Sequence, residues 1–307
     1  MVRGVFAVDK ESGPTSQRVL NLCKDRLRTK KLGHSGTLDP LASGLLVVAA
    51  GPSTRLLSYI TGAEKRYLAH FVLGVTTDTY DITGVVLSKS DASGIGLSDV
   101  LAAKAALEGE IQQCPPRFSA IHVDGRRAYD LARKNVEFEI EPRSATVYGL
   151  DIDENEDGSF LMSCHVSSGT YVRSLIFDLG QILGVGATMT ALRRTHVGAI
   201  SLEKAKKVES LSPDDVLSPK EVFPLDVHLV LGDDREISNI RNGRSIALQD
   251  SILHKVEPSP LVCGVRAFLY EGNTVSFDGL LAVGEVSNGL FAPKVVMPGG
   301  GAPIDRP

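Results

Sequence analysis

The chain has 307 residues, enough for about two domains of ordinary size, and its 43% hydrophobic and 23% charged residues are typical of a globular protein. The longest apolar stretch, residues 41–50, falls far short of the roughly 20 residues of a membrane-spanning helix, and the first residues lack the apolar core of a signal peptide. Four scattered cysteines without a Cys-x-x-Cys pair give no sign of a zinc site or a disulfide framework. We therefore expect a cytoplasmic protein without metal.

The beginning of the chain is basic, although the formal net charge is −4. Residues 1–66 hold 11 Lys and Arg against 5 Asp and Glu, and five of these cations fall within residues 24–31. They follow a predicted helix that begins with Ser16 as its cap, and apolar residues repeat along one side of it, at Val19, Leu20, Cys23 and Leu27. The basic run fits either a solvated helix face or a surface that attracts a polyanion.

A loop around Asp39 is the most informative part of the sequence. Residues 33–46, GHSGTLDPLASGLL, surround this single carboxylate with glycines, a proline and small hydroxyl residues, which is typical of an ordered loop. A short apolar run, Leu45–Ala50, then has the length and branching of a buried strand. Asp before Pro is also a common turn starter, so the pattern alone fits a structural turn as well as a catalytic carboxylate.

The middle of the chain contains a segment rich in cations and aromatic rings. A strand is predicted at Leu68–Val75 and a helix from a Ser98 cap to about Leu107. Between Pro115 and about Arg143 the core periodicity is lost, and guanidinium groups are interleaved with rings. Such a mixture suits an RNA loop, because cations meet phosphates while rings stack on bases. A surface insertion with incidental arginines is the alternative.

Residues 172–183 predict an amphipathic helix that ends before Gly184. Arg173 lies in its first turn, where a cation faces the positive end of the helix dipole. That position is unfavourable unless an anion lies nearby, and we expect Asp39 to be this anion.

The last part of the chain reads as a small β-structure. An Asn288-Gly289 turn between Val283–Val286 and Leu290–Val296 predicts a hairpin, and Arg241–Arg244 predicts a second turn. From residue 201 onward, 11 basic residues face 15 acidic ones, which does not favour strong RNA binding.

These motifs resemble, in order, those of the bacterial TruB family, the pseudouridine synthases that modify uridine 55 of transfer RNA. The loop around Asp39 matches the family's signature loop, and residues 9–16 resemble its first motif, with Glu11 where many members carry proline. Further resemblances occur at Lys65-Arg66-Tyr67 and at residues 115–120, 169–173 and 192–198. The match is weaker after residue 225.

The resemblance implies an α+β fold. We expect residues 1–225 to form a catalytic domain with a largely antiparallel mixed sheet flanked by helices, interrupted at about 115–143 by a thumb-like insertion that clasps the T-arm. A small PUA-like β-barrel domain is expected at 226–296 and a disordered tail at 297–307. The implied partner is transfer RNA, bound by a monomer.

The implied reaction is an isomerisation at a single uridine. The N1–C1′ bond breaks, the uracil turns over, and C5 is joined to C1′, so no cofactor or metal is expected. A carboxylate can serve as nucleophile or base if it stays ionised in a site closed to water, and Arg173 would keep Asp39 ionised. Attack at C1′, addition at C6 and removal of the C2′ proton all remain open.

The resemblance also assigns the remaining site residues. Tyr67 would stack on the extracted base and exchange a proton, His34 would meet displaced nucleotides, and Leu192 would form an apolar wall. Packing in the core explains a lone Tyr or Leu equally well. Further RNA contacts are expected from Lys10, Arg117, Arg126, Arg127, Tyr129, Arg133, Tyr171 and Arg193.

Two other functions compete with this interpretation of the residues. A glycoside hydrolase needs two carboxyl groups that flank the scissile bond, and the motifs supply one. An RNA-folding factor that keeps the pocket but turns over little is the more serious rival.

Overall fold

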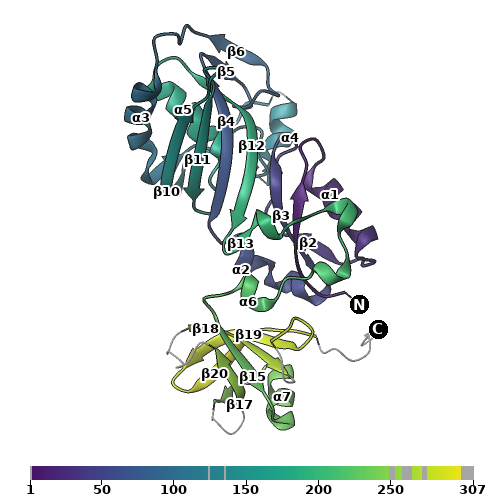
Figure 1. Cartoon of the computed structure of the whole chain (residues 1–307). Coiled ribbons are helices and arrows are strands. Elements are labelled where there is room, and N and C mark those ends of the chain that lie inside the picture. Colours follow the sequence, from purple (N-terminus) through teal and green to yellow (C-terminus); the bar gives the residue numbers. More distant parts are fainter. Residues whose placement is uncertain are drawn as a thin grey trace.

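The computed structural model describes residues 2–298, apart from 124, 135, 249–252, 258–264 and 272–274. Two β-sheets lie one beyond the other along the molecule (Figure 1). Nearly all of the tail predicted at 297–307 and the thiol of Cys263 lie outside the described residues. Within this part of the chain, no helix combines the length and apolar character needed to cross a membrane.

The larger sheet confirms the predicted mixed, largely antiparallel architecture. Its strand order is β14-β1-β3-β12-β4-β11-β10-β7, with β2 paired to β3 and β13 paired to β12. Only the β1–β14 and β3–β12 pairs run parallel among these strands. The strands are β1 (Gly4–Lys10), β2 (Leu32–His34), β3 (Ser43–Ala50), β4 (Lys65–Leu73), β7 (Gly109–Gln113), β10 (Arg143–Glu154), β11 (Phe160–Val166), β12 (Ala187–Val197), β13 (Ile200–Ser201) and β14 (Lys206–Lys207).

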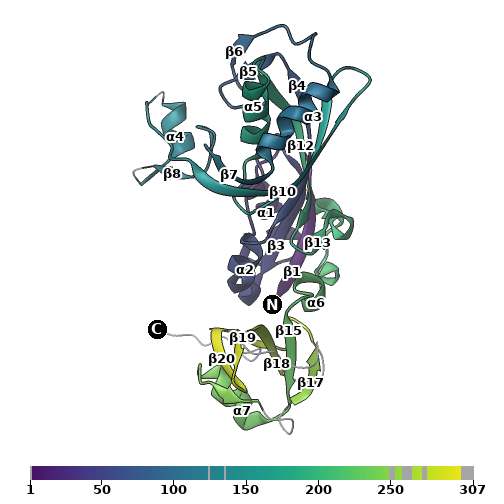
Figure 2. The same cartoon turned by 90° about the vertical axis from the view of Figure 1, so that its left-hand side faces the viewer.

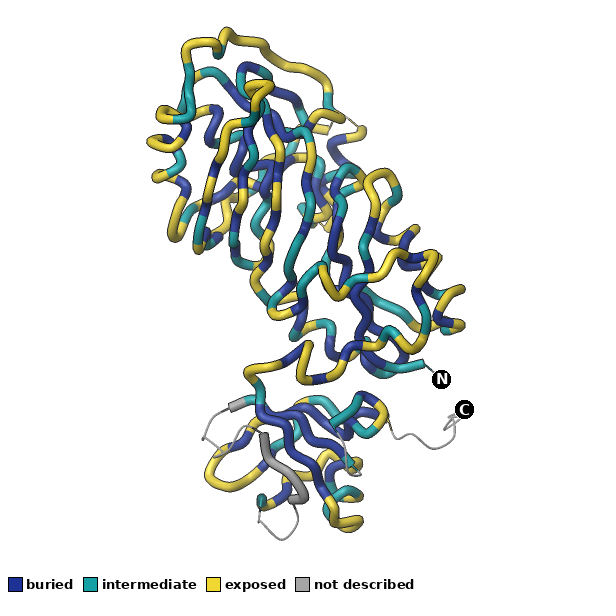
Figure 3. Tube along the Cα trace, in the orientation of Figure 1, coloured by how far each residue is buried: buried dark blue, intermediate teal, exposed yellow. Residues whose placement is uncertain are grey.

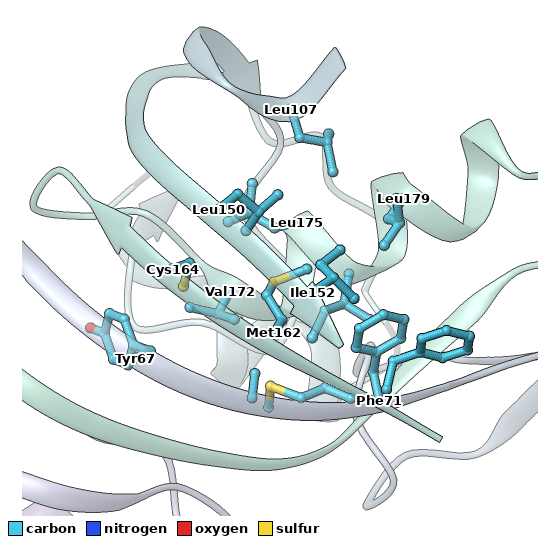
Figure 4. Close-up of a cluster of buried hydrophobic side chains, with 14 of the residues drawn as sticks. Tyr67, Phe71, Leu107, Leu150, Ile152, Met162, Cys164, Val172, Leu175 and Leu179 are labelled. Atoms are coloured by element: carbon cyan, nitrogen blue, oxygen red, sulfur yellow. The ribbon is translucent and has the colours of Figure 1, made fainter. Parts of the chain in front are cut away.

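Helices cover this sheet and connect it to the second one. The α-helices of the chain are α1 (Ser16–Arg26), α2 (Leu57–Thr61), α3 (Leu97–Lys104), α4 (Ala128–Arg133), α5 (Val172–Ile182), α6 (Pro219–Val222) and α7 (Asp234–Arg241). Short 3₁₀ helices occupy Gly51–Leu56, Ala105–Leu107, Leu202–Lys204, Val208–Ser210 and Pro213–Asp215. The predicted helix at 172–183 is confirmed as α5, which buries Leu175, Ile176 and Leu179 against the sheet (Figure 4).

Several predicted element starts were wrong. Thr15, not Ser16, caps α1 by accepting a hydrogen bond from the Arg18 amide. Gly96 precedes α3 in place of the predicted Ser98, and the Asp99 carboxylate accepts from its amide. Strand β4 begins at Lys65, ahead of the predicted Leu68, because pairing with β11 and β12 extends over the whole segment.

The thumb, residues 115–143, projects from the sheet as a separate arm (Figure 2). It carries the short ribbon β8 (His122–Val123) and β9 (Arg126–Arg127), followed by α4. A second two-stranded ribbon, β5 (Val75–Thr77) and β6 (Val86–Lys89), extends from β4.

The second sheet has the order β16-β20-β19-β18-β15-β17. Its strands are β15 (Val227–Leu231), β16 (Ile246–Ala247), β17 (Leu253–Glu257), β18 (Val265–Glu271), β19 (Leu280–Ser287) and β20 (Leu290–Val296). The predicted hairpin is confirmed, since Asn288 (φ 51°) and Gly289 (φ 72°) both have the positive φ of a type I′ turn. Residues 241–244 contain the predicted turn: Arg241 is the last residue of α7, and Asn242 and Gly243, which has a φ of 76°, form a turn directly after it.

One buried cluster joins the two sheets. It contains Val47 and Ile60 from the first part of the chain and Phe268 and Val283 from the second. The buried segments of both sheets are visible in Figure 3. Next to the cluster, Arg266 donates two hydrogen bonds of 2.6 Å to Asp226 and lies 5.2 Å from the ring centre of Tyr59.

Candidate active site

The loop that carries Asp39 is held in place by buried polar groups. It connects β2 to β3, and its far side is fastened by Ser16, whose hydroxyl donates to the Leu38 carbonyl (2.9 Å) and accepts from the Leu38 amide (2.8 Å). At the strand entrance, Gly44 has a φ of +96°, and a Cβ there would lie 2.3 Å from the Arg194 carbonyl. Only glycine allows β3 to approach β12 this closely.

Lys10 supports the same loop from beneath. The residue is 1% exposed, and its ammonium donates to the carbonyls of Glu11 (3.0 Å), Pro40 (3.3 Å) and Ala42. Burial lowers its pKa to about 8, although the nearby Asp39 opposes this change. The prediction that Lys10 contacts RNA is therefore corrected, because the carbonyls of the loop enclose its ammonium.

Asp39 and Arg173 form the predicted ion pair. Arg173 Nη2 lies 2.8 Å from Asp39 Oδ2, and the two side chains are 4% and 39% exposed, respectively. The start of α5 is fixed by Gln113, whose amide side chain donates to the Tyr171 carbonyl and accepts from its N–H. The guanidinium is thus buried, while the carboxylate keeps one side open.

A second carboxylate, which the sequence analysis missed, also faces Arg173. Asp81 is 4% exposed, and its Oδ2 lies 3.7 Å from Arg173 Nη1. The same guanidinium donates to the carbonyls of Thr79 (2.8 Å) and Phe118 (3.2 Å). The Asp and Thr residues at 76–83 indicate a polar loop, but nothing in their spacing connects it with residue 173.

Tyr67 lies at one end of the main hydrophobic cluster, with its hydroxyl turned away from the other labelled side chains (Figure 4). Burial raises the pKa of this phenol, and a hydrogen bond with the Arg194 guanidinium opposes the change. Arg194, also missed, is 1% exposed and donates to the carbonyls of Leu45 (2.8 Å) and Gly36 (3.2 Å). It therefore joins the β3 entrance to the Asp39 loop.

These groups surround a cavity of about 300 Å³. Five of the predicted site residues line it, namely Asp39, Tyr67, Tyr171, Arg173 and Leu192. The other walls come from the loop at 35–38, from Lys65 and from Ser119 and Ala120 at the base of the thumb. The volume is at the lower end of the range for small-molecule sites and suits one planar base.

Comparison with known proteins identifies the family. Residues 24–172 match the TruB family pseudouridylate synthase N-terminal domain, and residues 173–220 match the tRNA pseudouridylate synthase B C-terminal domain. The tRNA pseudouridine synthase B of Rhodococcus jostii is 43% identical over 220 residues, which cover 70% of this chain and 72% of the relative. The chain belongs to the TruB family.

Other similarities extend further along this TruB-family chain. The tRNA pseudouridine synthase B of Clostridium kluyveri is 38% identical over 261 residues, covering 82% of the chain and 88% of the relative. A chain from the crystal structure of a Cbf5–Nop10–Gar1 complex shares the fold, with a TM-score of 0.70 at 24% identity over 96% of this chain and 85% of that one.

The remaining predicted residues of the TruB-family site lie outside the cavity. His34 is half-buried, its Nδ1 accepts from the Gly36 amide (3.3 Å), and burial lowers its pKa. Arg193 donates to Asp9 (2.8 Å) and is 41% exposed. Both residues border the loop without reaching the Asp39–Arg173 pair.

The thumb cations divide into two kinds. Arg117 donates to the Val136 carbonyl (3.0 Å) and lies 4.9 Å from the centre of the Phe138 ring, so it braces the thumb. Arg133 lies 4.3 Å from the centre of the Tyr129 ring. All four arginines are exposed, but Arg126 and Arg127 on β9 have neither a ring contact nor an ion pair with any described residue.

A second group of exposed cations lies at the C-terminal end of α1 and directly after it. Arg26, Arg28, Lys30 and Lys31 are exposed and have no carboxylate partner among the described residues.

The described residues show no cluster of three or more possible metal ligands. On β11, Cys164 is buried, and the neighbouring His165 lies 3.1 Å from Glu64.

Proposed function

We propose that this protein converts uridine 55 in the T-loop of transfer RNA to pseudouridine. The observation that carries the proposal is the Asp39–Arg173 contact of 2.8 Å inside a base-sized cavity, in a chain of the TruB family. The relatives named tRNA pseudouridine synthase B support the same class of RNA and the same reaction.

Asp39 is the group that acts on the nucleotide. Its partly open carboxylate faces the cavity, while the guanidinium behind it is fixed by three further oxygen contacts. Such a preorganised guanidinium holds the carboxylate in one orientation and needs no reorganisation during the reaction. The N1–C1′ bond breaks, C5 bonds to C1′, and the C5 proton is released as N1 gains one, so the atoms balance without a cofactor.

Tyr67 and Leu192 hold the uracil ring. The burial that raises the pKa of the Tyr67 phenol keeps it protonated at neutral pH, where it serves as a planar stacking surface and a hydrogen-bond donor. Leu192, 9% exposed, lines the same cavity as an apolar wall. Extraction of the uridine from its stack costs a few kcal/mol, which contacts with the rest of the RNA must supply.

The exposed cations supply those contacts. Arg126 and Arg127 on the thumb and Lys30 and Lys31 after α1 present charges that no described carboxylate neutralises. We assign the T-arm to the surface between these groups, with the thumb as its clasp. A transfer RNA substrate would place the reaction in the cytoplasm, and a monomeric state stays a prediction that light scattering after gel filtration tests.

The chain is proposed to divide into a catalytic domain (1–225) and a PUA-like domain (226–296). The second sheet begins at Val227, which supports this boundary. Because acidic residues outnumber basic ones after residue 201, we assign this domain a small share of the RNA affinity.

Replacement of Asp39 by Asn tests the function. Mapping of pseudouridine in transfer RNA treated with purified protein should show uridine 55 modified by the wild type, and a rate lower by at least about a thousandfold for Asp39→Asn. The exposed Asp151→Asn is the matched control and should keep the wild-type rate. Full activity of Asp39→Asn would refute the proposal.

The same variant separates the rival function of an RNA-folding factor. The exposed cations do not depend on Asp39, so Asp39→Asn should bind transfer RNA and assist its refolding as well as the wild type does. Refolding assistance by a wild-type protein that modifies no uridine would favour the rival.

A further inference from the structure

Tyr80 lies between two of the groups that hold the catalytic arginine. On one side of it, the Thr79 carbonyl accepts a hydrogen bond from Arg173 Nη1 (2.8 Å). On the other side, Asp81 Oδ2 faces the same nitrogen at 3.7 Å. The conformation of one residue therefore decides whether both oxygens point to the guanidinium.

That conformation is unusual for a bulky residue. Tyr80 has a φ of +64°, in the left-handed region that glycine adopts easily and other residues adopt at a cost. Strained backbone of this kind persists only where the surroundings enforce it, and it occurs often at functional sites.

The surroundings of Tyr80 supply that enforcement. Its ring stacks on Phe177 with a centroid distance of 4.0 Å and an interplanar angle of 18°. Phe177 lies four residues after Arg173 on α5, so the two side chains occupy neighbouring positions on one helical face. The ring stack therefore fastens the loop to the same helix that presents the guanidinium.

Strand β12 holds the loop from its other side. The Met189 amide donates to the Tyr80 carbonyl (3.1 Å), and the Ile82 amide donates to the Met189 carbonyl (2.9 Å). Within the loop, Asp81 Oδ1 accepts from the Thr79 hydroxyl and from both the amide and the hydroxyl of Thr83. Asp81 Oδ2 is left to face Arg173.

We propose that Tyr80 is a positioning residue for the reaction and acts through Asp81 and Arg173. Its ring holds the left-handed turn that aims the Thr79 carbonyl and the Asp81 carboxylate at the guanidinium, which in turn orients Asp39. This inference rests on the proposed function. The phenol hydroxyl makes no hydrogen bond to a described residue, so the ring and not the hydroxyl performs the role.

Three substitutions separate this role from general stability. Tyr80→Phe keeps the stack and should retain the wild-type kcat. Tyr80→Ala and Tyr80→Gly remove the stack and should lower kcat roughly ten- to hundredfold with an unchanged dissociation constant for transfer RNA. Gly relieves the backbone strain, so a role limited to stability predicts recovery of kcat in Tyr80→Gly. Recovery in that variant, or a loss confined to RNA affinity, overturns the inference.

A double-mutant cycle tests whether Tyr80 acts through Asp81. In an Asp81→Asn background, the effect of Tyr80→Ala on kcat should shrink to less than about twofold, because coupled residues are not additive. Additive losses overturn the inference. If Tyr80→Ala does not fold, Phe177→Ala removes the stack from the other side and should reproduce the kcat loss.

A crystal structure of Tyr80→Gly gives a result that does not depend on turnover. We expect the Arg173 guanidinium to move away from Asp39, and an undisturbed contact overturns the inference. A wild-type protein without activity would instead refute the proposed function, whatever the position of this guanidinium.

Discussion

The Arg173 guanidinium is shared by two carboxylates that come from different loops. Nη2 contacts Asp39 and the Phe118 carbonyl, and Nη1 contacts the Thr79 carbonyl and faces Asp81. The planar fork of arginine satisfies these partners in fixed directions, whereas a lysine ammonium is a single point charge.

Arg173→Lys should therefore lower kcat although it keeps the charge. We expect a loss of at least about tenfold, because the ammonium cannot orient Asp39 and contact the other oxygens together. Single-turnover kinetics with transfer RNA measure the effect. Arg241→Lys, at an exposed ion pair with Glu271, is the matched control, and equal rates for the two variants would contradict this argument.

Asp178, on the same helix as Arg173, should make stability depend on pH. Burial raises its pKa to about 6, so the folded protein binds this proton more tightly than the unfolded chain does. The resulting stabilisation is complete below pH 4 and is lost as the pH rises through 6. At pH 8 the free energy of unfolding of Asp178→Asn should thus exceed that of the wild type by on the order of 1 kcal/mol, after a discount for solvent exposure. The variant should accordingly unfold at a higher urea concentration.

The comparison of urea curves at pH 8 and pH 4.5 provides the check. The difference between Asp178→Asn and the wild type should shrink at the lower pH. The exposed Asp151→Asn should show no such trend. A difference for Asp178→Asn that is the same at both pH values would rule out the proposed titration.

Single residues could be predicted from the sequence where a charge was unfavourable in its local position and therefore required a partner of opposite charge. Arg173 in the first turn of a helix required an anion, and Asp39, the carboxylate of the signature loop, supplied it. Asp81 and Arg194 carried no such local signal, and only the fold brings them near their partners. The prediction for Lys10 was wrong because a sequence motif does not show whether a lysine is exposed to RNA or buried beneath a loop.

At the level of elements, the thumb carries two kinds of exposed arginine. Arg117 and Arg133 stack on the thumb's own rings, whereas Arg126 and Arg127 have no described partner. Composition alone grouped all four cations as RNA contacts, because it does not reveal which rings are already occupied.

Arg126→Glu with Arg127→Glu should weaken transfer RNA binding without changing the chemical step. We expect the dissociation constant to rise roughly tenfold or more near physiological salt, and the slope of log affinity against log salt to fall by about 2. The rate at saturating RNA should stay within about twofold of the wild type. The exposed pair Arg235→Glu with Arg244→Glu is the control, and equal weakening by it would deny the thumb a special role.

The element boundaries show why propensity alone was insufficient. Ser16 has the chemistry of a helix cap, but its hydroxyl is used by Leu38, and Thr15 caps the helix instead. A long-range contact therefore displaced the cap by one residue. The Asn288-Gly289 hairpin, by contrast, was predicted correctly because its positive φ values are dictated locally.

At the level of the whole molecule, the two sheets share one hydrophobic cluster. Phe268 is fully buried in it and stacks on Phe223 at 4.4 Å, close to the segment that connects the sheets. Sequence analysis placed two domains next to each other, but it could not show that residues on both sides of the boundary would complete a common core.

Phe268→Ala should consequently destabilise both sheets together. A cost of about 3–5 kcal/mol is expected for removal of a buried phenylalanine, and hydrogen exchange should accelerate in β3 as well as in β19. Leu225→Ala, at a side chain 94% exposed, should leave exchange unchanged. Faster exchange restricted to the second sheet would indicate that the two parts open independently.

The long sequence separation of Asp39 and Arg173 has a consequence for protein synthesis. A ribosome releases the signature loop well before it has made the helix that bears the matching guanidinium. A prematurely terminated polypeptide would carry the acidic residue without its counterion, and it would have no means of aiming that residue at cellular RNA. Modification therefore begins only when most of the chain has been translated and folded.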